Sequence, residues 1–313
     1  LYEAYKEMTV KNRPPLVSII VNCFNGERFL RESLSSIFSQ SYQNFEVIFW
    51  DNRSTDKSKE IAKSFDGRLK YFLAKDHSEL GKARVSALEK AMGDYICFLD
   101  TDDLFAKDRL TEQVAFMEFN RVSLSYGSHA LIDITGTIRK TKILREGVSY
   151  QLKEQLTRYT ICMATVMIRK ELFDLKWCFL DPSLVYSPDA NLFLKILANY
   201  PAGVMAKVLS YYRIHDNQLS KKTFSHVGFE HKVTLDELKR LFPEVTNSLL
   251  PTFDWAYSKV NFYDAIGYIH DRDYAKAQLT IAPVTSKSIY YKLLNLLIIF
   301  RVPAPMISWL LSR

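Results

Sequence analysis

The sequence predicts an α/β protein with a mainly parallel central sheet, and three observations lead to this fold class. Residues 16–21, 45–50 and 95–99 are nearly continuous apolar runs, the pattern of strands buried on both faces. The segments between these runs carry apolar residues at helical spacing. Each run ends in polar residues, and in open α/β sheets ligands bind beyond the carboxyl ends of the strands. We therefore expect a binding site at that edge of the sheet.

The first third of the chain alternates strands with helices. The strand at 16–21 is followed by the Asn25-Gly26 turn and by a helical pattern that includes Leu34 and Ile37. The chain then continues with a strand at 45–50, a helix at about 57–65 capped within 54–56, a strand at 69–73, a helix at 81–92 and a strand at 95–99. This order is typical of doubly wound folds built from right-handed crossover units.

The pattern changes beyond residue 123. Further strands are expected at 124–127, 164–169 and 204–212, with a helix at about 189–200. From residue 224 the pattern is mainly helical, at 233–242, at 248–272 and in the basic segment that ends the chain. We divide the chain into an N-terminal tail at 1–15, a main domain at 16–222 and a helical C-terminal region at 223–313.

The composition is that of a globular protein. Hydrophobic residues make up 48% and charged residues 25% of the chain, which provides a sizeable core and disfavours disorder. The four cysteines show neither a Cys-x-x-Cys pair nor metal-ligand spacing, so we expect buried free thiols in a reducing compartment. Residues 1–15 are polar and charged, so no secretory signal is expected.

The formal net charge of +7 suits phosphate ligands, an anionic membrane or nucleic acid. Residues 274–313 contain no Asp or Glu and combine Lys and Arg with largely apolar runs at 293–300 and 307–311. The longer run falls short of the ~18 residues that a spanning helix needs. We predict a segment lying in the membrane interface, which makes the protein cytoplasmic and peripheral on the inner face of the cytoplasmic membrane. The alternative is a helix packed on the domain. Nucleic-acid binding is not expected, since no recognition motif is present.

Three carboxylates, Asp100, Asp102 and Asp103, follow the strand at 95–99 directly. Crowded carboxylates repel one another unless a cation lies among them. Hard divalent ions bind carboxylate oxygens and bridge to phosphates, so the cluster predicts a Mn²⁺ or Mg²⁺ site. Asp103 is also expected to cap a helix that begins at Leu104.

Four segments in chain order carry a family resemblance: Val21-Asn22-Cys23-Phe24-Asn25-Gly26-Glu27, Asp51-Asn52-Arg53-Ser54-Thr55-Asp56, Gly81-Lys82-Ala83-Arg84 and Asp100-Thr101-Asp102. With these segments the sequence resembles the family 2 glycosyltransferases of the GT-A fold, over about residues 16–220. The resemblance implies a nucleotide-diphosphate sugar donor, with UDP-sugars favoured, and a divalent metal.

The resemblance also implies roles for the matching residues. Phe24 packs on the donor base, and Asp51 accepts a hydrogen bond from the base edge with help from Asn52. Arg84 pairs with the diphosphate, and Asp100 lies near the ribose and a metal-bound water. The implied nucleotide-binding set is Asn22, Phe24, Asn25, Glu27, Asp51, Asn52, Arg84, Asp100 and Thr101.

The metal ligands are implied in the same way. Asp102 binds the metal directly, and the Tyr211-Tyr212-Arg213-Ile214-His215 segment resembles the family's Y-Y-R-x-H segment. There His215 completes the metal shell or contacts the pyrophosphate, and the alternative is a structural histidine. Val85 stands where the family usually has Asn after the arginine.

Asp189 is the implied catalytic base, because Ser187-Pro188-Asp189-Ala190-Asn191-Leu192 resembles the family's E-D-x-D-L segment. As base, Asp189 would take the proton from an acceptor hydroxyl. Pro188 and Asn191 replace the family's Glu and second Asp. The alternative interpretation makes Asp189 an ordinary acidic residue at a helix N-terminus.

The resulting hypothesis is an inverting glycosyltransferase that acts on a glycan or lipid-linked acceptor in surface polysaccharide or glycoconjugate assembly. Two alternatives stay open: a nucleotidyltransferase of related fold, for which the single glycine in 22–28 is unfavourable, and a non-catalytic nucleotide-sugar-binding scaffold. An NAD-dependent oxidoreductase is not expected, because no G-x-G-x-x-G follows a strand.

Overall fold

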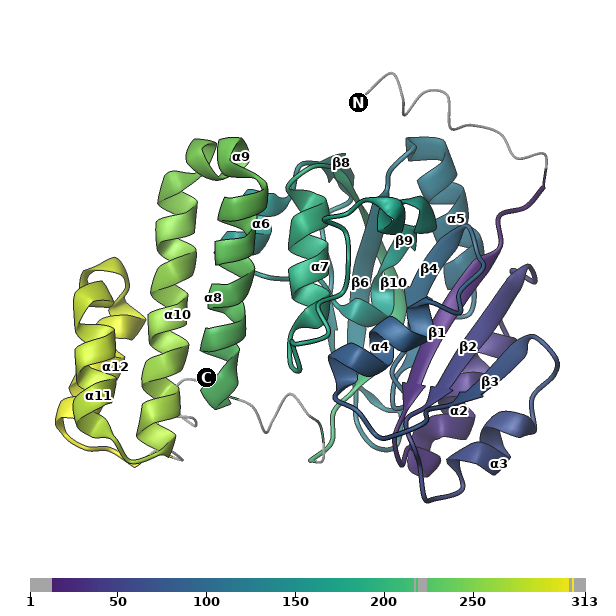
Figure 1. Cartoon of the computed structure of the whole chain (residues 1–313), viewed down its shortest axis with the longest axis horizontal. Helices are drawn as coiled ribbons and strands as arrows, with labels where there is room; N and C mark the ends of the chain where they lie inside the picture. The colour runs from purple at the N-terminus through teal and green to yellow at the C-terminus, as the bar shows by residue number, and fades with distance from the viewer. Residues whose placement is uncertain (1–12, 217, 219–223, 304–305, 307–313) are drawn as a thin grey trace. The chain divides into compact units, whose positions relative to one another are not determined.

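The computed structural model describes residues 13–216, 218, 224–303 and 306 (Figure 1). The strands are β1 (Val17–Cys23), β2 (Phe45–Asp51), β3 (Leu69–Leu73), β4 (Tyr95–Phe98), β5 (Leu104–Phe105), β6 (Leu124–Ile132), β7 (Ile138–Lys142), β8 (Gly147–Ser149), β9 (Met167–Arg169) and β10 (Ala202–Arg213). The α-helices are α2 (Glu27–Phe38), α3 (Ser58–Lys63), α4 (Leu80–Leu88), α5 (Arg109–Asn120), α6 (Leu152–Thr157), α7 (Pro188–Leu197), α8 (Phe224–Leu241), α9 (Pro243–Ser248), α10 (Leu250–His270), α11 (Tyr274–Ile281) and α12 (Ile289–Ile299). Short 3-10 helices span Met163–Thr165, Lys170–Asp174 and Ala282–Lys287.

The first four strands pair as a doubly wound sheet requires. β1 lies between β2 and β4, β3 lies beyond β2, and all three pairings are parallel. The register places Cys23 beside Asp51 and Ile20 beside Phe98, so the carboxyl ends of β1, β2 and β4 meet at one edge. This is the edge where the sequence places its polar residues, and the predicted α/β class is confirmed.

The sheet becomes mixed beyond β4. β9 lies between β4 and β6 and is antiparallel to both, whereas β6 and β10 pair in parallel. β5 and β8 pair antiparallel with β10, and β7 pairs antiparallel with β6. The sequence did not predict this arrangement, because strands of two or three residues such as β5 and β8 carry no readable periodicity.

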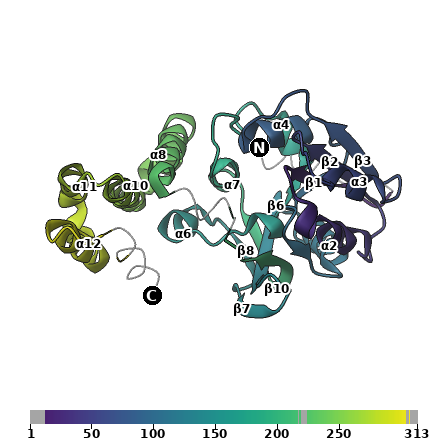
Figure 2. The same cartoon turned by 90° about the horizontal axis from the view of Figure 1, so that it is seen from below.

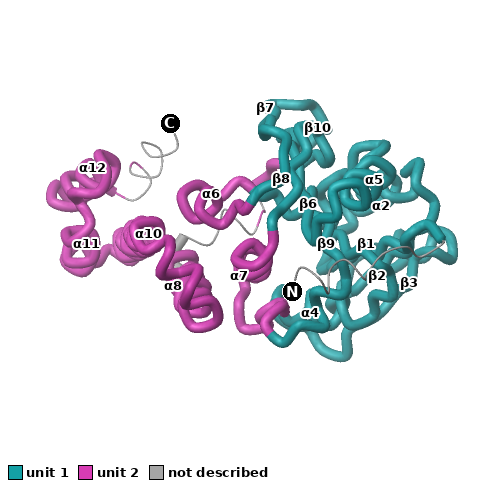
Figure 3. The backbone as a smooth tube through the Cα atoms, turned by 90° about the horizontal axis from the view of Figure 1, so that it is seen from above, with its two compact units in different colours: residues 1–149, 161–176, 201–213 teal, residues 150–160, 177–200, 214–313 magenta. Residues whose placement is uncertain are grey.

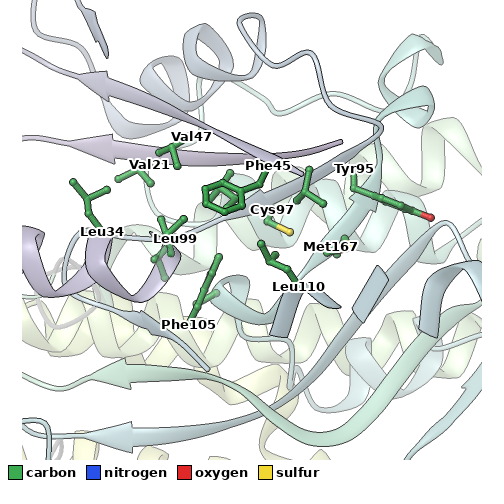
Figure 4. Close-up of a cluster of buried hydrophobic side chains, with 14 of the residues drawn as sticks. Val21, Leu34, Phe45, Val47, Tyr95, Cys97, Leu99, Phe105, Leu110 and Met167 are labelled. Carbon is green, nitrogen blue, oxygen red and sulfur yellow. The ribbon is translucent and has the colours of Figure 1, made fainter. Parts of the chain in front are cut away.

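The main core lies on one face of the parallel strands. Val21 and Val47 pack there with Leu34 of α2 and Leu110 of α5 (Figure 4). α4 contacts β1 and β2, and Figure 2 shows α4 and α2 on opposite sides of β1. Both faces of β1 are therefore covered, which is the physical reason for its continuous apolar run.

One local prediction was wrong, since Asp103 does not cap a helix. The residues after it form the short strand β5, and the next helix, α5, begins at Arg109. The Asp103 carboxylate accepts the backbone N–H of Arg213 at 2.9 Å instead. Pairing of β5 with β10 thus overrides the local helix signal of Leu104 onwards.

The chain divides into two compact units, which Figure 3 colours teal and magenta. Unit 1 comprises residues 1–149, 161–176 and 201–213, and unit 2 comprises residues 150–160, 177–200 and 214–313. The domain boundary between residues 222 and 223 follows from the change to a mainly helical residue pattern, and it stays a prediction. Residues 1–12 of the predicted tail lie outside the described residues.

Unit 2 contains a small apolar core of its own. Ala265 and Ile269 of α10, Ile281 of α11, and Tyr291 and Leu294 of α12 are buried together. Among the described helices, none combines the length and the apolar character that a membrane crossing requires. The predicted apolar run at 307–311 lies outside the described residues.

The prediction of free thiols is confirmed. The four cysteines, Cys23, Cys97, Cys162 and Cys178, form no disulfide, and three of them are buried while Cys162 is half-buried. Burial raises the pKa of Cys97 to about 11 and those of Cys162 and Cys178 to about 12. These thiols stay protonated at neutral pH and are poor nucleophiles.

Candidate functional site

Two loops at the carboxyl edge of the sheet hold each other in place. After β1, the Asn25 side-chain oxygen accepts the N–H of Thr55 at 2.8 Å, and the Glu27 carboxylate accepts the N–H of Lys57 at 2.9 Å. In return, the Ser54 hydroxyl accepts the N–H of Asn25 at 3.0 Å. Asn25 and Glu27 therefore fix the loop after β2, and the donor contacts expected of them stay a prediction.

Asp51, the last residue of β2, is buried, and both of its carboxylate oxygens accept hydrogen bonds. One oxygen accepts the N–H of Ser54 at 2.7 Å, and the other accepts the Tyr71 hydroxyl at 2.5 Å. Burial, followed by the hydrogen bond to Asp51, raises the pKa of Tyr71 well above its ordinary value, so Tyr71 stays a donor. A carboxylate offers about four acceptor positions, so Asp51 keeps the capacity to bind a base edge.

Asn52 positions an aromatic pair that the sequence did not reveal. Its side chain donates to the Ser78 carbonyl at 2.6 Å and accepts the Ser78 N–H at 3.1 Å. This exchange fixes the loop after β3, where the exposed ring of His77 lies 4.2 Å from the exposed ring of Phe24. The two ring planes are inclined by 49°, and each exposed ring offers a face of the kind on which a nucleobase stacks. No motif marked His77, and only the fold brings it to Phe24.

Asn22 and Trp50 are neighbours in register across β1 and β2. The Asn22 amide nitrogen and the Trp50 indole nitrogen are both buried without a hydrogen-bond partner among the described residues. Buried donors without acceptors are costly, and the nucleotide contact expected of Asn22 stays a prediction.

Arg84 and the loop after β4 complete this edge of unit 1. The buried Arg84 guanidinium forms an ion pair with Asp100 at 3.2 Å, and 41% of the Asp100 side chain is exposed. A Cβ on Gly26 would lie only 3.0 Å from the Thr101 hydroxyl, so the loop after β1 packs closely against the acidic loop, residues 100–103. The structure thus brings the predicted residues that follow β1, β2 and β4 to one edge, with Arg84 beside Asp100.

The acidic loop has the chemistry of a hard-cation site. Burial raises the pKa of the Asp103 carboxyl well above its ordinary value, and the neighbouring Asp102 and Asp100 raise it further. Among the described residues no three His, Cys, Asp or Glu side chains converge as a ready metal cage. Mg²⁺-like ions are usually held by one or two carboxylates together with substrate phosphates, so Asp100 and Asp102 fit a divalent metal that arrives with its donor.

Arg213, for which the sequence predicts no role of its own, organises this loop. Its fully buried guanidinium donates to the Asp102 carbonyl at 2.9 Å, the Asp133 carbonyl at 3.2 Å and the Glu32 carboxylate at 2.7 Å. It also lies 4.5 Å from the centre of the Phe29 ring. The Tyr-Tyr-Arg segment contained this residue, but a buried arginine has no sequence signature that separates it from an exposed one.

We expect Arg213→Lys to lower the free energy of unfolding by about 2 to 4 kcal/mol, since one ammonium cannot reach three acceptors fixed for a planar guanidinium. Urea unfolding measures this loss. Arg139→Lys is the matched control, because Arg139 also contacts Asp133 but is 65% exposed, and little change is expected there. Equal losses for the two variants would contradict the role of Arg213.

In unit 2, Asp189 lies half-buried in the first turn of α7, with Ser187 as N-cap and Pro188 in the first turn. The structure also explains one departure from the family pattern. The Asn191 amide donates to the Glu237 carboxylate at 2.7 Å and to the Thr234 hydroxyl at 3.2 Å. An aspartate at 191 would oppose Glu237 in a buried position, so asparagine is the compatible residue.

His215 follows the end of β10 by two residues and is half-buried. Its backbone N–H donates to the Gln218 side chain at 3.3 Å. Along the chain it comes two residues after Arg213, which holds the Asp102 carbonyl. The metal role of His215 and the base role of Asp189 stay predictions.

The fold and these ordered loops define a glycosyltransferase, and comparisons with known proteins agree. The model of the family described as "Glycosyl transferase family 2" matches residues 18–175. This chain belongs to glycosyl transferase family 2.

Two relatives illustrate the similarity. An uncharacterized glycosyltransferase of Haemophilus influenzae is 35% identical over 201 residues, covering 58% of this chain and 80% of the relative. The Escherichia coli UDP-Glc:alpha-D-GlcNAc-diphosphoundecaprenol beta-1,3-glucosyltransferase WfgD is 29% identical over 216 residues. The match covers 68% of this chain and 82% of WfgD.

Two solved structures share the fold. Staphylococcus aureus TarS 1–349 in complex with UDP-GlcNAc has a TM-score of 0.66 at 20% identity, covering 89% of this chain and 88% of that one. The mannosyltransferase PcManGT of Pyrobaculum calidifontis in complex with GDP-Man and Mn²⁺ has a TM-score of 0.59 at 13% identity. The match covers 98% of this chain and 92% of that one. The GT-A fold expected from the sequence is confirmed.

Proposed function

We propose that this glycosyltransferase moves a sugar from a UDP-sugar to a hydroxyl of a lipid-linked glycan, with inversion, during surface glycan assembly. The observation that carries the proposal is the set of predicted donor residues at one edge of the sheet, including Phe24, Asp51, Arg84 and Asp100. The names of two similar proteins support it, since WfgD uses UDP-Glc and a diphosphoundecaprenol-linked acceptor and TarS binds UDP-GlcNAc.

The donor half of the mechanism follows from unit 1. Phe24 stacks on the base, Asp51 accepts from its edge, and Arg84 pairs with the diphosphate. Asp102 and His215 would hold Mn²⁺ or Mg²⁺, with Asp100 beside them. When bound, the metal neutralises charge that develops on the departing nucleotide diphosphate.

The acceptor half depends on Asp189. Its carboxylate takes the proton from the acceptor hydroxyl as the oxygen attacks the anomeric carbon, and the bond to the diphosphate oxygen breaks on the opposite side. This single displacement inverts the anomeric centre. Membership in a glycosyltransferase family argues against the nucleotidyltransferase and the non-catalytic scaffold considered above.

A thermal-shift panel tests the donor. UDP, GDP and their sugars are compared with Mn²⁺, with Mg²⁺ and with EDTA. A ligand that binds only the folded protein should raise Tm by about 5 °C at roughly 100 times its Kd. We expect the largest shift for a UDP-sugar with metal. A shift of equal size for GDP-sugars, or one indifferent to EDTA, would contradict the proposed donor or the proposed metal.

We also propose that α12 docks on an anionic lipid surface. One face of α12 is buried with α10 and α11, while an apolar stripe on another face stays exposed: Ile289, Leu293, Leu296 and Phe300, of which Phe300 is 77% exposed. Exposed Lys292 and Arg301 flank the stripe, and residues 274–313 contain no acid. Apolar side chains bordered by cations suit the interface of an anionic bilayer.

Flotation with phosphatidylglycerol vesicles tests this surface. The double variant Leu296→Asp/Phe300→Asp should lose flotation. Two carboxylates on the exposed stripe are costly to bury in a bilayer, and they repel its anionic headgroups. Phe119→Asp is the matched control, since Phe119 is 87% exposed on α5 of unit 1, and its flotation should match wild type. Equal flotation of all three proteins would remove α12 as the docking surface.

A further inference from the structure

We propose that Glu230 is a positioning residue for Asp189 and holds the first turn of α7 in the orientation that proton transfer needs. This inference rests on the role proposed for Asp189 as base. Both residues belong to unit 2, and four donors just before and at the start of α7 bond to the Glu230 carboxylate.

Glu230 lies on α8 and is only 4% exposed. Its carboxylate accepts three successive backbone N–H groups, those of Val185 at 2.7 Å, Tyr186 at 3.1 Å and Ser187 at 2.7 Å. The Tyr186 N–H reaches both carboxylate oxygens at 3.1 Å, and the Ser187 hydroxyl is the fourth donor, at 2.8 Å. Hydrogen bonds to an ionised acceptor are roughly twice as strong as neutral ones, so this turn is tightly held.

The four donors also use the acceptor capacity of the Glu230 carboxylate. A carboxylate has about four acceptor positions, and four donors occupy those of Glu230. Glu230 therefore has no lone pair left for a substrate proton or a metal. The Glu230 carboxylate therefore holds the backbone in place, and it affects the reaction only through the segment that it binds.

That segment leads directly into Asp189. Ser187 is the N-cap of α7, but its hydroxyl bonds to Glu230 and makes no capping bond within the helix. Pro188 follows with its backbone φ angle fixed by the ring, and Asp189 comes next in the same turn. With Ser187 anchored and Pro188 rigid, the backbone of Asp189 has little freedom of its own.

The rest of α7 is held by the same face of α8. Thr234 and Glu237 lie four and seven residues after Glu230, the spacing of one helical face. Glu237 accepts from Asn191 at 2.7 Å and forms an ion pair with the buried Lys195 at 3.6 Å. These contacts act further along α7, whereas Glu230 acts at the end that carries Asp189.

The test measures manganese-dependent release of UDP from UDP-glucose, UDP-galactose and UDP-N-acetylglucosamine, with water as the acceptor. Glu230→Gln keeps the side-chain length but replaces one acceptor oxygen by an NH₂ group facing N–H donors. We expect kcat to fall between about 10-fold and 100-fold while the KM for the UDP-sugar stays within about twofold. In an Asp189→Asn background, Glu230→Gln should cause no further loss, because both changes act through one group.

Asp236→Asn is the matched control. Asp236 is an acid on the same helix, but it contacts Lys232 and Tyr257 and not α7, so kcat should equal that of wild type. Ser187→Ala is a milder variant that removes one of the four donors. It covers the case in which Glu230→Gln fails to fold, and it should lower kcat by a few fold with KM unchanged.

Three other outcomes would each overturn a stated part of the proposal. Unchanged kcat in folded Glu230→Gln and in Ser187→Ala, with Asp189→Asn inactive, overturns the positioning role and leaves the proposed base intact. An active Asp189→Asn overturns the base itself. A wild-type protein that releases UDP from none of the three sugars overturns the proposed donor, and this inference falls with it.

Discussion

Asp102→Asn is expected to lower kcat for sugar transfer by about 1,000-fold and to raise the metal concentration needed for half-maximal rate. Arg213 holds the Asp102 carbonyl, and Asp102 lies beside the buried Asp103 in the acidic loop. Asparagine keeps the shape of the side chain but removes the charge that favours a divalent cation. The measurement is UDP release from a UDP-sugar during titration with Mn²⁺.

Two comparisons sharpen this result. Asp108→Asn removes an exposed acid six residues along the chain that makes no side-chain cap, and its rate should equal that of wild type. His215→Ala should cost less than Asp102→Asn, because a neutral imidazole contributes no charge to the site. Full metal-dependent transfer by Asp102→Ala would show that Asp102 is not a metal ligand.

Asp189→Asn is expected to lower kcat by about 100-fold to 10,000-fold, the usual contribution of a general base. The KM for the UDP-sugar should change little, since the donor contacts proposed here come from unit 1. Asparagine cannot accept the acceptor proton, so the loss should fall on kcat. Initial rates at varied UDP-sugar concentration, with wild type measured in parallel, give kcat and KM.

Asp181→Asn is the control for this variant. Asp181 is another acid of unit 2, whose carboxylate accepts the N–H and hydroxyl of Ser183, and its loss should leave kcat unchanged. A normal rate for Asp189→Asn would return Asp189 to the alternative of an acidic residue at a helix N-terminus, where only a small stabilising effect is expected.

The two halves of the candidate site differ in how far the sequence predicts them. The donor half follows strands whose apolar runs are long and buried on both faces, so their carboxyl ends could be located from the pattern alone. Asp51 and Asp100 therefore lie where expected. Asp103 was misassigned because a two-residue strand, β5, has no periodicity, and its pairing with β10 depends on residues more than a hundred positions away.

The supporting contacts were beyond the sequence. His77 meets Phe24, Arg213 holds the Asp102 carbonyl, and Glu230 holds the turn before Asp189. Each partner comes from a distant part of the chain and is an ordinary residue type in its local context. Propensity and spacing describe neighbours along the chain, whereas these contacts exist only once strands and helices have packed.

The sequence by itself determined the α/β class, the positions of the first four strands along the chain, the free thiols and the family, the last through four motifs of which three lie at strand ends and one lies in α4. Hydrophobic periodicity and turn residues are local properties, and they suffice for those conclusions. Only the tertiary structure decided how the acidic loop is held, why Asn191 suits its position and which residue anchors the start of α7. Those answers depend on burial and on charges brought together from distant segments, which a linear pattern does not contain.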